Sequence, residues 1–171
     1  MITKGIQGDL DTVWSIIDRC RASLRQRGIF QWDMVYPTRE TAAQDMNVGG
    51  LYVLTSLSQM LAVVTIDTQH EDEYNTVRWT TSEPALIVHR LCVDPEVQGQ
   101  GIGRRLMEFV EQFAVRQRFS SVRLDAYSGN SRALALYRQR GYREVGQVFF
   151  PRRTMPFHCF ELDLTSAQSS H

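Results

Sequence analysis

The sequence predicts an α/β (mixed α+β) fold in which a mixed β-sheet carries helices on its faces. Two β-rich runs, 51–54 and 60–66, are joined by a short polar segment, which indicates a hairpin. Strand and helix patterns then alternate through the middle of the chain. Of the 171 residues, 43% are hydrophobic, enough to fill one substantial core. We therefore expect one domain over 1–164 and a polar C-terminal tail at 165–171.

Two helices are expected before the hairpin. Asp9 is placed to cap the first helix, whose apolar residues recur at helical spacing until Gly28. Thr38 is placed to cap a second, shorter helix that ends near Gly49 and Gly50. After the hairpin, the polar and acidic stretch 67–83 predicts a loop, which we interpret as a solvated one.

The second half of the chain predicts four strands and two helices. The apolar run 85–93 runs into a glycine-rich turn and then into a helix from Ile102 that keeps its apolar residues on one face. Gly141 suits the position just after the later of these two helices, at 131–140. The remaining expected elements are a buried strand at 122–126, the helix at 131–140, and final strands at 142–150 and 157–164.

Charge and composition narrow the function classes. The formal net charge is zero, which argues against a protein that binds nucleic acid by neutralising phosphates. Residues 1–85 carry 7 Lys and Arg against 11 Asp and Glu, whereas residues 86–171 carry 12 against 8. The basic second half is compatible with an anionic ligand there, or with a charge split of no functional meaning.

No metal site or membrane segment is expected. Cys20, Cys92 and Cys159 are widely spaced and form no CxxC pair, and the four histidines lack metal-binding spacing. The N-terminus lacks the apolar run of a signal peptide, and no apolar run approaches the length of a membrane span. The default expectation is a cytoplasmic protein.

The most informative stretch is Gln98-Gly99-Gln100-Gly101-Ile102-Gly103-Arg104. It lies between a predicted strand and a predicted helix, where glycines allow close approach of a ligand and the helix start offers unpaired N–H groups. A dinucleotide-binding fingerprint needs glycine where Leu106 stands, and a P-loop needs Gly-Lys-Ser/Thr, which is absent. The pattern thus predicts a phosphate site of another kind, with a purely structural turn as the alternative.

The sequence resembles the GNAT superfamily of acetyl-CoA-dependent N-acetyltransferases. The stretch from Gln98 to Gly103 is similar to the family's pyrophosphate loop, and Asn130, with Ala133 and Tyr137 after it, is similar to its second block. The resemblance covers about a third of the chain directly and extends to an uncharacterised bacterial subgroup. It implies a GNAT-like, mostly antiparallel sheet of six to seven strands flanked by about four helices, and acetyl-CoA as the acetyl donor.

The resemblance also implies which residues hold acetyl-CoA. Leu91, Cys92 and Val93 would lie along the pantetheine arm, with backbone groups offered by Leu91 and Val93. The amides from Gly99 to Arg104 would hold the pyrophosphate, and Asn130 would hydrogen-bond further along the cofactor. The expected cofactor-binding set is Leu91, Cys92, Val93, Gln98, Gly99, Gln100, Gly101, Ile102, Gly103, Arg104, Asn130, Ala133 and Tyr137.

Three residues are candidates for the chemistry. Tyr137 matches the family's proton donor to the departing sulfur. Because a phenol is a weaker acid than a thiol, we expect it to hydrogen-bond the developing thiolate before any proton moves. His89 and Asp125 are the candidate general bases, and a chain of ordered water with no dedicated base remains a third possibility.

The acceptor is expected to be a small-molecule amine. Trp32, Tyr36, Trp79 and Phe150 are candidate substrate-binding residues, with core packing as the alternative, and the acidic residues of 67–83 would attract a cation. A protein N-terminus or lysine is the alternative acceptor, and an acyl-CoA sensor without catalysis is the alternative of another class. The sequence leaves the oligomeric state open, although relatives are often homodimers.

Overall fold

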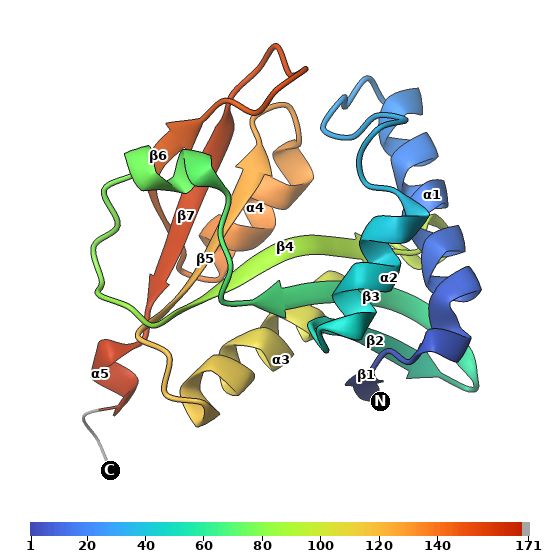
Figure 1. Cartoon of the computed structure of the whole chain (residues 1–171), viewed down its shortest axis with the longest axis horizontal. Helices are drawn as coiled ribbons and strands as arrows, with labels where there is room; N and C mark the ends of the chain where they lie inside the picture. The colour runs from blue at the N-terminus through green and yellow to red at the C-terminus, as the bar shows by residue number, and fades with distance from the viewer. Residues whose placement is uncertain (169–171) are drawn as a thin grey trace. The chain divides into compact units, whose positions relative to one another are not determined.

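The computed structural model describes residues 1–168 and divides the chain into two compact units. Unit 1 comprises Met1–Ile66 and Arg90–Phe109, and unit 2 comprises Asp67–His89 and the chain from Val110 onward. Seven strands form a sheet in the order β1-β2-β3-β4-β5-β7-β6 (Figure 1). Strand β4 (Ala85–Val93) contributes its first part to unit 2 and its last part to unit 1.

Unit 1 is built on an antiparallel meander. Strands β1 (Ile2–Lys4), β2 (Leu51–Ser56) and β3 (Gln59–Asp67) pair antiparallel. Leu57 and Ser58 form the two-residue turn of the β2–β3 hairpin, both with positive φ, which matches the twist of the strands it joins. The hairpin is therefore confirmed, with longer strands and a tighter turn than the sequence predicts.

Helices α1 (Leu10–Gln26) and α2 (Arg39–Asn47) complete unit 1 and begin differently. Thr38 caps α2 as predicted, because its side chain accepts a hydrogen bond from the Thr41 N–H at 3.2 Å. Asp9 occupies the cap position of α1, yet its carboxylate accepts from the Ile6 N–H at 3.0 Å and closes the short 3-10 turn η1 (Gln7–Asp9).

The core of unit 1 lies between these helices and the meander. Its apolar members include Val13, Ile16, Leu51 and Val63, each at most 1% exposed. Next to this core, the guanidinium of Arg90 forms an ion pair with Asp45, and Asp45 also accepts from Thr65 at 2.9 Å. This buried pair joins α2, β3 and β4.

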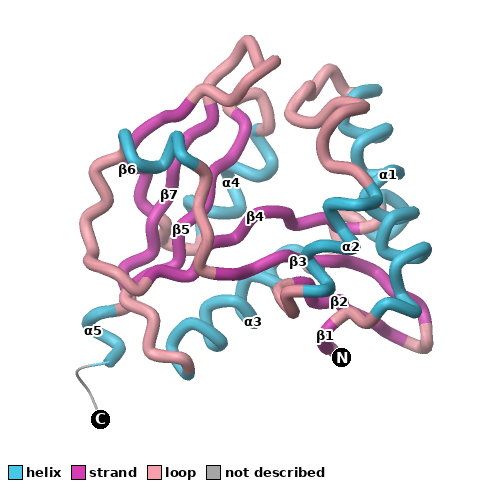
Figure 2. Tube along the Cα trace, in the orientation of Figure 1, coloured by secondary structure: helices cyan, strands magenta, loops and turns pink. Residues whose placement is uncertain are grey.

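Unit 2 contains strands β5 (Ser121–Tyr127), β6 (Arg143–Val148) and β7 (Phe157–Asp163). Strand β7 pairs antiparallel with both β5 and β6, and β5 pairs in parallel with β4. Helix α4 (Ser131–Gln139) packs on one face of β5 and β7. On the other face lies the segment Asp67–Glu83. After Asp67, the last residue of β3, it is drawn as loop apart from the short helix η2 (Asp72–Thr76) (Figures 1 and 2).

Glycine ends α4 as the sequence predicts. Gly141 has φ +88°, and the N–H of Tyr142 donates to the carbonyl of Tyr137 at 3.1 Å while that of Gly141 donates to Arg138. This pattern of two bonds satisfies the last carbonyls of the helix and needs a left-handed residue. Tyr142 is thereby brought against Tyr137, with ring centroids 5.9 Å apart.

The predicted fold class is confirmed, with two differences in detail. Strand β1 is not predicted, because three residues are too few to show a periodic pattern. Residues Thr165–Gln168 of the predicted tail form the short helix α5, and 169–171 lie outside the described residues. Across residues 1–168, we find no helix with the length and apolar character that crossing a membrane requires.

Candidate functional site

The glycine turn in unit 1 has the backbone conformation of an anion cradle. Gly99 and Gly101 have φ of +83° and +76°, a conformation that side chains with a Cβ rarely adopt. Gly101 accepts the first helical hydrogen bond of α3 (Ile102–Arg116), from the Arg105 N–H at 3.1 Å. The amides at the first three helical positions, Ile102 to Arg104, therefore have no acceptor within the helix.

The charge around this helix start also favours an anion. The first turn of α3 holds no acidic residue, and Arg104 and Arg105 are both exposed there. The positive end of the helix dipole adds to their charge. The predicted pyrophosphate loop thus has both the backbone conformation and the charge that such a ligand requires, and the residues present fit acetyl-CoA.

The turn is held in place by buried polar contacts. Asp94, only 3% exposed, accepts from the Glu96 N–H at 3.2 Å and forms an ion pair with Arg19 of α1. The Gln98 side-chain amide donates to the Val93 carbonyl at 3.0 Å, and so does the Cys20 thiol. The side chain of Gln98 therefore shapes the turn, and the amides after it are left to meet a ligand.

The pairing between β4 and β5 ends before either strand does. The parallel ladder covers Ala85–Val88 and Ser121–Leu124, yet β4 continues to Val93 and β5 to Tyr127. Leu91 and Val93 lie beyond the last pair, as an extended ligand adding to the strand would need. The Cys92 side chain is 2% exposed within the core of unit 1, so this residue can offer only backbone groups to such a ligand.

The second predicted block starts α4. The Asn130 side-chain oxygen accepts from the Ala133 N–H at 3.1 Å and caps the helix. Two turns later Tyr137 is 7% exposed, and its ring lies 6.0 Å from that of Phe160. Phe160 pairs with Leu124, whereas Asp125 pairs with Cys159, so Tyr137 packs on the sheet face opposite to the Asp125 side chain.

Both predicted bases lie together in unit 2. His89 and Asp125 directly follow the last paired residues of β4 and β5 and project to the same face. The His89 Nε2 lies 2.7 Å from the Asp67 Oδ1, and the Asp125 Oδ2 accepts from the Tyr74 hydroxyl at 2.7 Å. The structure therefore assembles two carboxylates, one imidazole and one phenol.

The environment of Asp125 suits proton transfer near neutral pH. Burial raises the pKa of Asp125 from 3.8 to about 6, although the Tyr74 hydrogen bond and the charge of His89 act in the opposite direction. The carboxylates of Glu71 and Glu73 raise it further. A group with such a pKa exchanges protons readily at physiological pH.

The four predicted substrate residues divide between the units and take different roles. Trp32 is 8% exposed within the core of unit 1, and the Tyr36 hydroxyl accepts from Arg90. In unit 2, the Trp79 ring stacks on Arg123 at 4.8 Å, and Phe150 packs edge-on against Phe157 at 5.0 Å. Much of the surface of Trp32 and Trp79 is therefore used in packing against other residues. Core packing is the alternative to substrate binding that the sequence leaves open.

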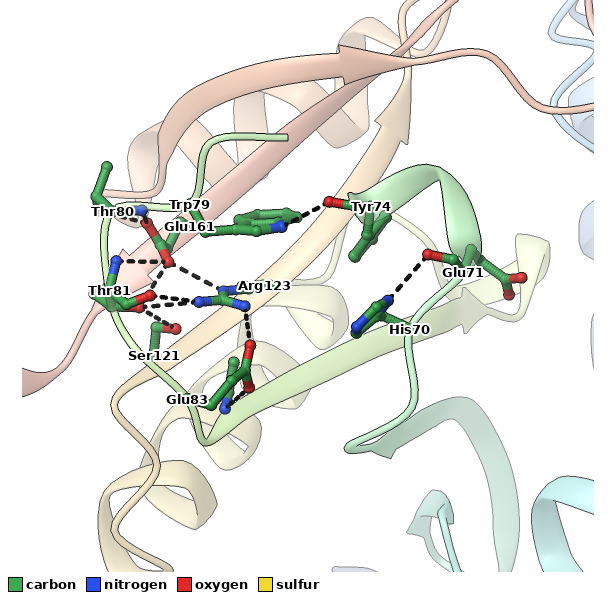
Figure 3. Close-up of polar contacts among 11 residues, drawn as sticks. His70, Glu71, Tyr74, Trp79, Thr80, Thr81, Glu83, Ser121, Arg123 and Glu161 are labelled. Atoms are coloured by element: carbon green, nitrogen blue, oxygen red, sulfur yellow. Dashed lines mark hydrogen bonds and ion pairs between the residues drawn. The ribbon is translucent and has the colours of Figure 1, made fainter. Parts of the chain in front are cut away.

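Sequence analysis missed the residues that fix the segment Asp67–Glu83. Glu161 of β7 accepts from Arg123 of β5 at 3.1 Å and from the Thr80 N–H and Thr81 hydroxyl at 2.8 and 2.7 Å (Figure 3). Glu161 and Arg123 are 2% and 3% exposed. Two opposite charges at alternating, otherwise apolar strand positions were the available signal, since such charges are almost never buried unless paired.

The comparisons with known proteins agree with the fold and with the predicted family. The model of the acetyltransferase (GNAT) family matches residues 18–142, so the chain belongs to this family of acyltransferases. The uncharacterized N-acetyltransferase YesJ of Bacillus subtilis is 24% identical over 162 residues, which cover 92% of this chain and 87% of YesJ. The expected family and enzyme class are therefore confirmed.

Other relatives match locally or in fold. The N-alpha-acetyltransferase RimI of Mycobacterium tuberculosis is 48% identical over 59 residues, 34% of this chain and 35% of RimI. A GNAT-family acetyltransferase structure from Streptococcus agalactiae has a TM-score of 0.80 at 18% identity, covering 95% of this chain and 94% of its own. The ribosomal-protein-S18-alanine N-acetyltransferase of Escherichia coli has a TM-score of 0.70 at 21% identity, covering 95% and 92%.

Proposed function

We propose that this chain transfers an acetyl group from acetyl-CoA to the primary amine of a small molecule, with Asp125 as the proton acceptor. The observation that carries the proposal is the cover over one face of β5 and β7. Tyr74, Trp79 and the two threonines that follow bind residues of β5 and β7. A covered face favours a small acceptor over a peptide, which would need an open groove.

Each half of the proposed reaction has its own residues. The amides from Gly99 to Arg104 would hold the pyrophosphate, and acetyl-CoA supplies the acyl group in an activated thioester. An amine with a pKa near 10.4 is mostly protonated at pH 7, which costs about 4–5 kcal/mol before it can attack. Asp125 would accept the proton, and the charge of His89, whose Nε2 lies 2.7 Å from the Asp67 Oδ1, favours the ionised form of Asp125.

Tyr137 is proposed to stabilise the leaving thiolate. Its burial between the rings of Tyr142 and Phe160 fixes the orientation of its own ring. Because a phenol has a higher pKa than a thiol, hydrogen bonding to the developing charge precedes any proton transfer.

A protein N-terminus is the second candidate acceptor, and the similarity to RimI favours it. A cytoplasmic location belongs to the same proposal and is supported by the three free, buried cysteines, which are typical of proteins from reducing compartments.

A screen of acceptors would test the proposal. The purified chain is incubated with acetyl-CoA and a panel of small amines and alanine-initiated peptides, and released thiol is followed. We expect turnover with small amines that Asp125→Asn lowers at neutral pH. Turnover with peptides alone would replace the small-molecule acceptor by a protein, and binding of acetyl-CoA without turnover of any acceptor would favour a sensor.

A further inference from the structure

Tyr74 lies at the centre of the contacts around Asp125. Its side chain is 3% exposed, and its hydroxyl donates to the Asp125 Oδ2 at 2.7 Å across 51 residues of sequence. Burial, followed by the charge of Asp125, raises the pKa of Tyr74 well above its usual value of 10. Tyr74 therefore remains a protonated donor throughout the working range of an acetyltransferase.

We infer that Tyr74 is a positioning residue: its buried hydroxyl fixes the orientation of the Asp125 carboxylate and stabilises its ionised form for proton acceptance. The inference deepens the proposed function and rests on Asp125 being the proton acceptor. A carboxylate can rotate about its last side-chain bond, so one strong hydrogen bond to Oδ2 selects an orientation in which Oδ1 is left for the amine proton.

The loop that carries Tyr74 is anchored so that this hydrogen bond is maintained. The indole N–H of Trp79 donates to the Tyr74 carbonyl at 3.1 Å, and its ring lies 5.1 Å from the Tyr74 ring (Figure 3). The same indole stacks on Arg123, which pairs with Glu161. The chain from Trp79 to Thr81 is thus fixed to β5 and β7, and Tyr74 is fixed to Trp79.

Titratable groups face Asp125 from the elements packed around it. His89 faces it from β4, Glu71 and Glu73 from the covering segment, and Cys159 from β7. The two glutamates favour the protonated form, whereas the charged form of His89 favours ionisation. Within this set Tyr74 contributes a direct neutral hydrogen bond, an effect that salt screens less than it screens the glutamates.

The test measures the titration of Asp125 without any substrate. Carboxyl carbons of aspartates are labelled with ¹³C, the Asp125 signal is assigned from its loss in Asp125→Asn, and its midpoint is followed by NMR between pH 3 and 9. Tyr74→Phe removes one oxygen and keeps the ring. Tyr52→Phe is the matched control, since Tyr52 is also a buried tyrosine, whose ring lies tilted against that of Phe109 with centroids 5.0 Å apart.

We expect the Asp125 midpoint to rise by about one pH unit in Tyr74→Phe and to stay within about 0.2 in Tyr52→Phe, because a hydrogen bond to a carboxylate is worth this much. An unchanged midpoint in Tyr74→Phe overturns the inference. Should Tyr74→Phe fail to fold, Trp79→Phe keeps a ring against Arg123 and loses the N–H to Tyr74. A smaller rise of the Asp125 midpoint in Trp79→Phe supports the inference, and an unchanged midpoint in Trp79→Phe overturns it.

Kinetics separate this inference from the proposed function. With an amine from the acceptor screen, the acidic limb of kcat/KM is measured in the same variants. If Asp125→Asn keeps the wild-type limb, Asp125 is not the proton acceptor and the proposed role fails whatever the NMR midpoints show. If Asp125→Asn loses the acidic limb of kcat/KM and Tyr74→Phe keeps this limb at the wild-type pH, only the role of Tyr74 fails.

Discussion

Asp125→Asn is predicted to stabilise the fold at neutral pH. In the unfolded chain this carboxyl ionises near 3.8, whereas burial raises its pKa in the folded protein to about 6. Between these values the folded state binds more protons than the unfolded state, so stability falls as pH rises. The difference of about 2 in pKa corresponds to a destabilisation of the folded state by about 3 kcal/mol at most. This destabilisation is fully present above pH 7 and absent below about pH 4.

The assay is urea unfolding of both proteins between pH 4 and 8. Asparagine is neutral, and its side-chain oxygen can still accept the hydrogen bond from Tyr74, so the variant removes the buried charge with little change in shape. We expect Asp125→Asn to be more stable by about 1–3 kcal/mol at pH 7.5, and the gain to disappear by pH 4. A gain that is independent of pH, or a loss at pH 7.5, would refute the reasoning.

Three further predictions follow from the site and its supports. Tyr137→Phe lowers kcat tenfold or more with an unchanged unfolding midpoint; full turnover removes Tyr137 from the mechanism. Acetyl-CoA at about 100 times its Kd raises Tm by about 5–10 °C, measured by thermal shift. Pantetheine, which lacks the pyrophosphate, raises Tm little, and so does acetyl-CoA added to Gly101→Val. Equal shifts in the three experiments would contradict binding of the pyrophosphate by the glycine turn. Glu161→Gln destabilises by about 1–3 kcal/mol in urea because Arg123 loses the buried one of its two carboxylate partners and keeps only the exposed Glu83. Glu40→Gln, at an exposed position, changes stability by less than about 0.5 kcal/mol.

Local patterns predicted most of the fold. Helix caps such as Thr38 and terminators such as Gly141 act within four residues, so the sequence around them carries the signal. The turn at Leu57 and Ser58 shows the limit: neither residue is typical of positive φ, and the pairing of β2 with β3 imposes it.

The candidate site was predicted in part, for the same physical reason. The glycine turn is contiguous in sequence, so a candidate phosphate cradle could be predicted from it. The contact of Tyr74 with Asp125 spans 51 residues, and that of Thr81 with Glu161 spans 80. Such contacts depend on the register of strands that pair far apart in the chain, and the acidic, polar composition of 67–83 suggests a solvated loop instead.

The uneven anchoring of the segment Asp67–Glu83 has an evolutionary consequence. Its C-terminal part is fastened to β5 and β7 through Glu161 and Arg123, whereas Gln69, His70, Glu71 and Asp72 are exposed to solvent. Mutations in that exposed stretch leave the fastening intact, so we expect them to be tolerated without loss of stability. Sequence diversity among close relatives should therefore concentrate at 69–72 and spare 79–81.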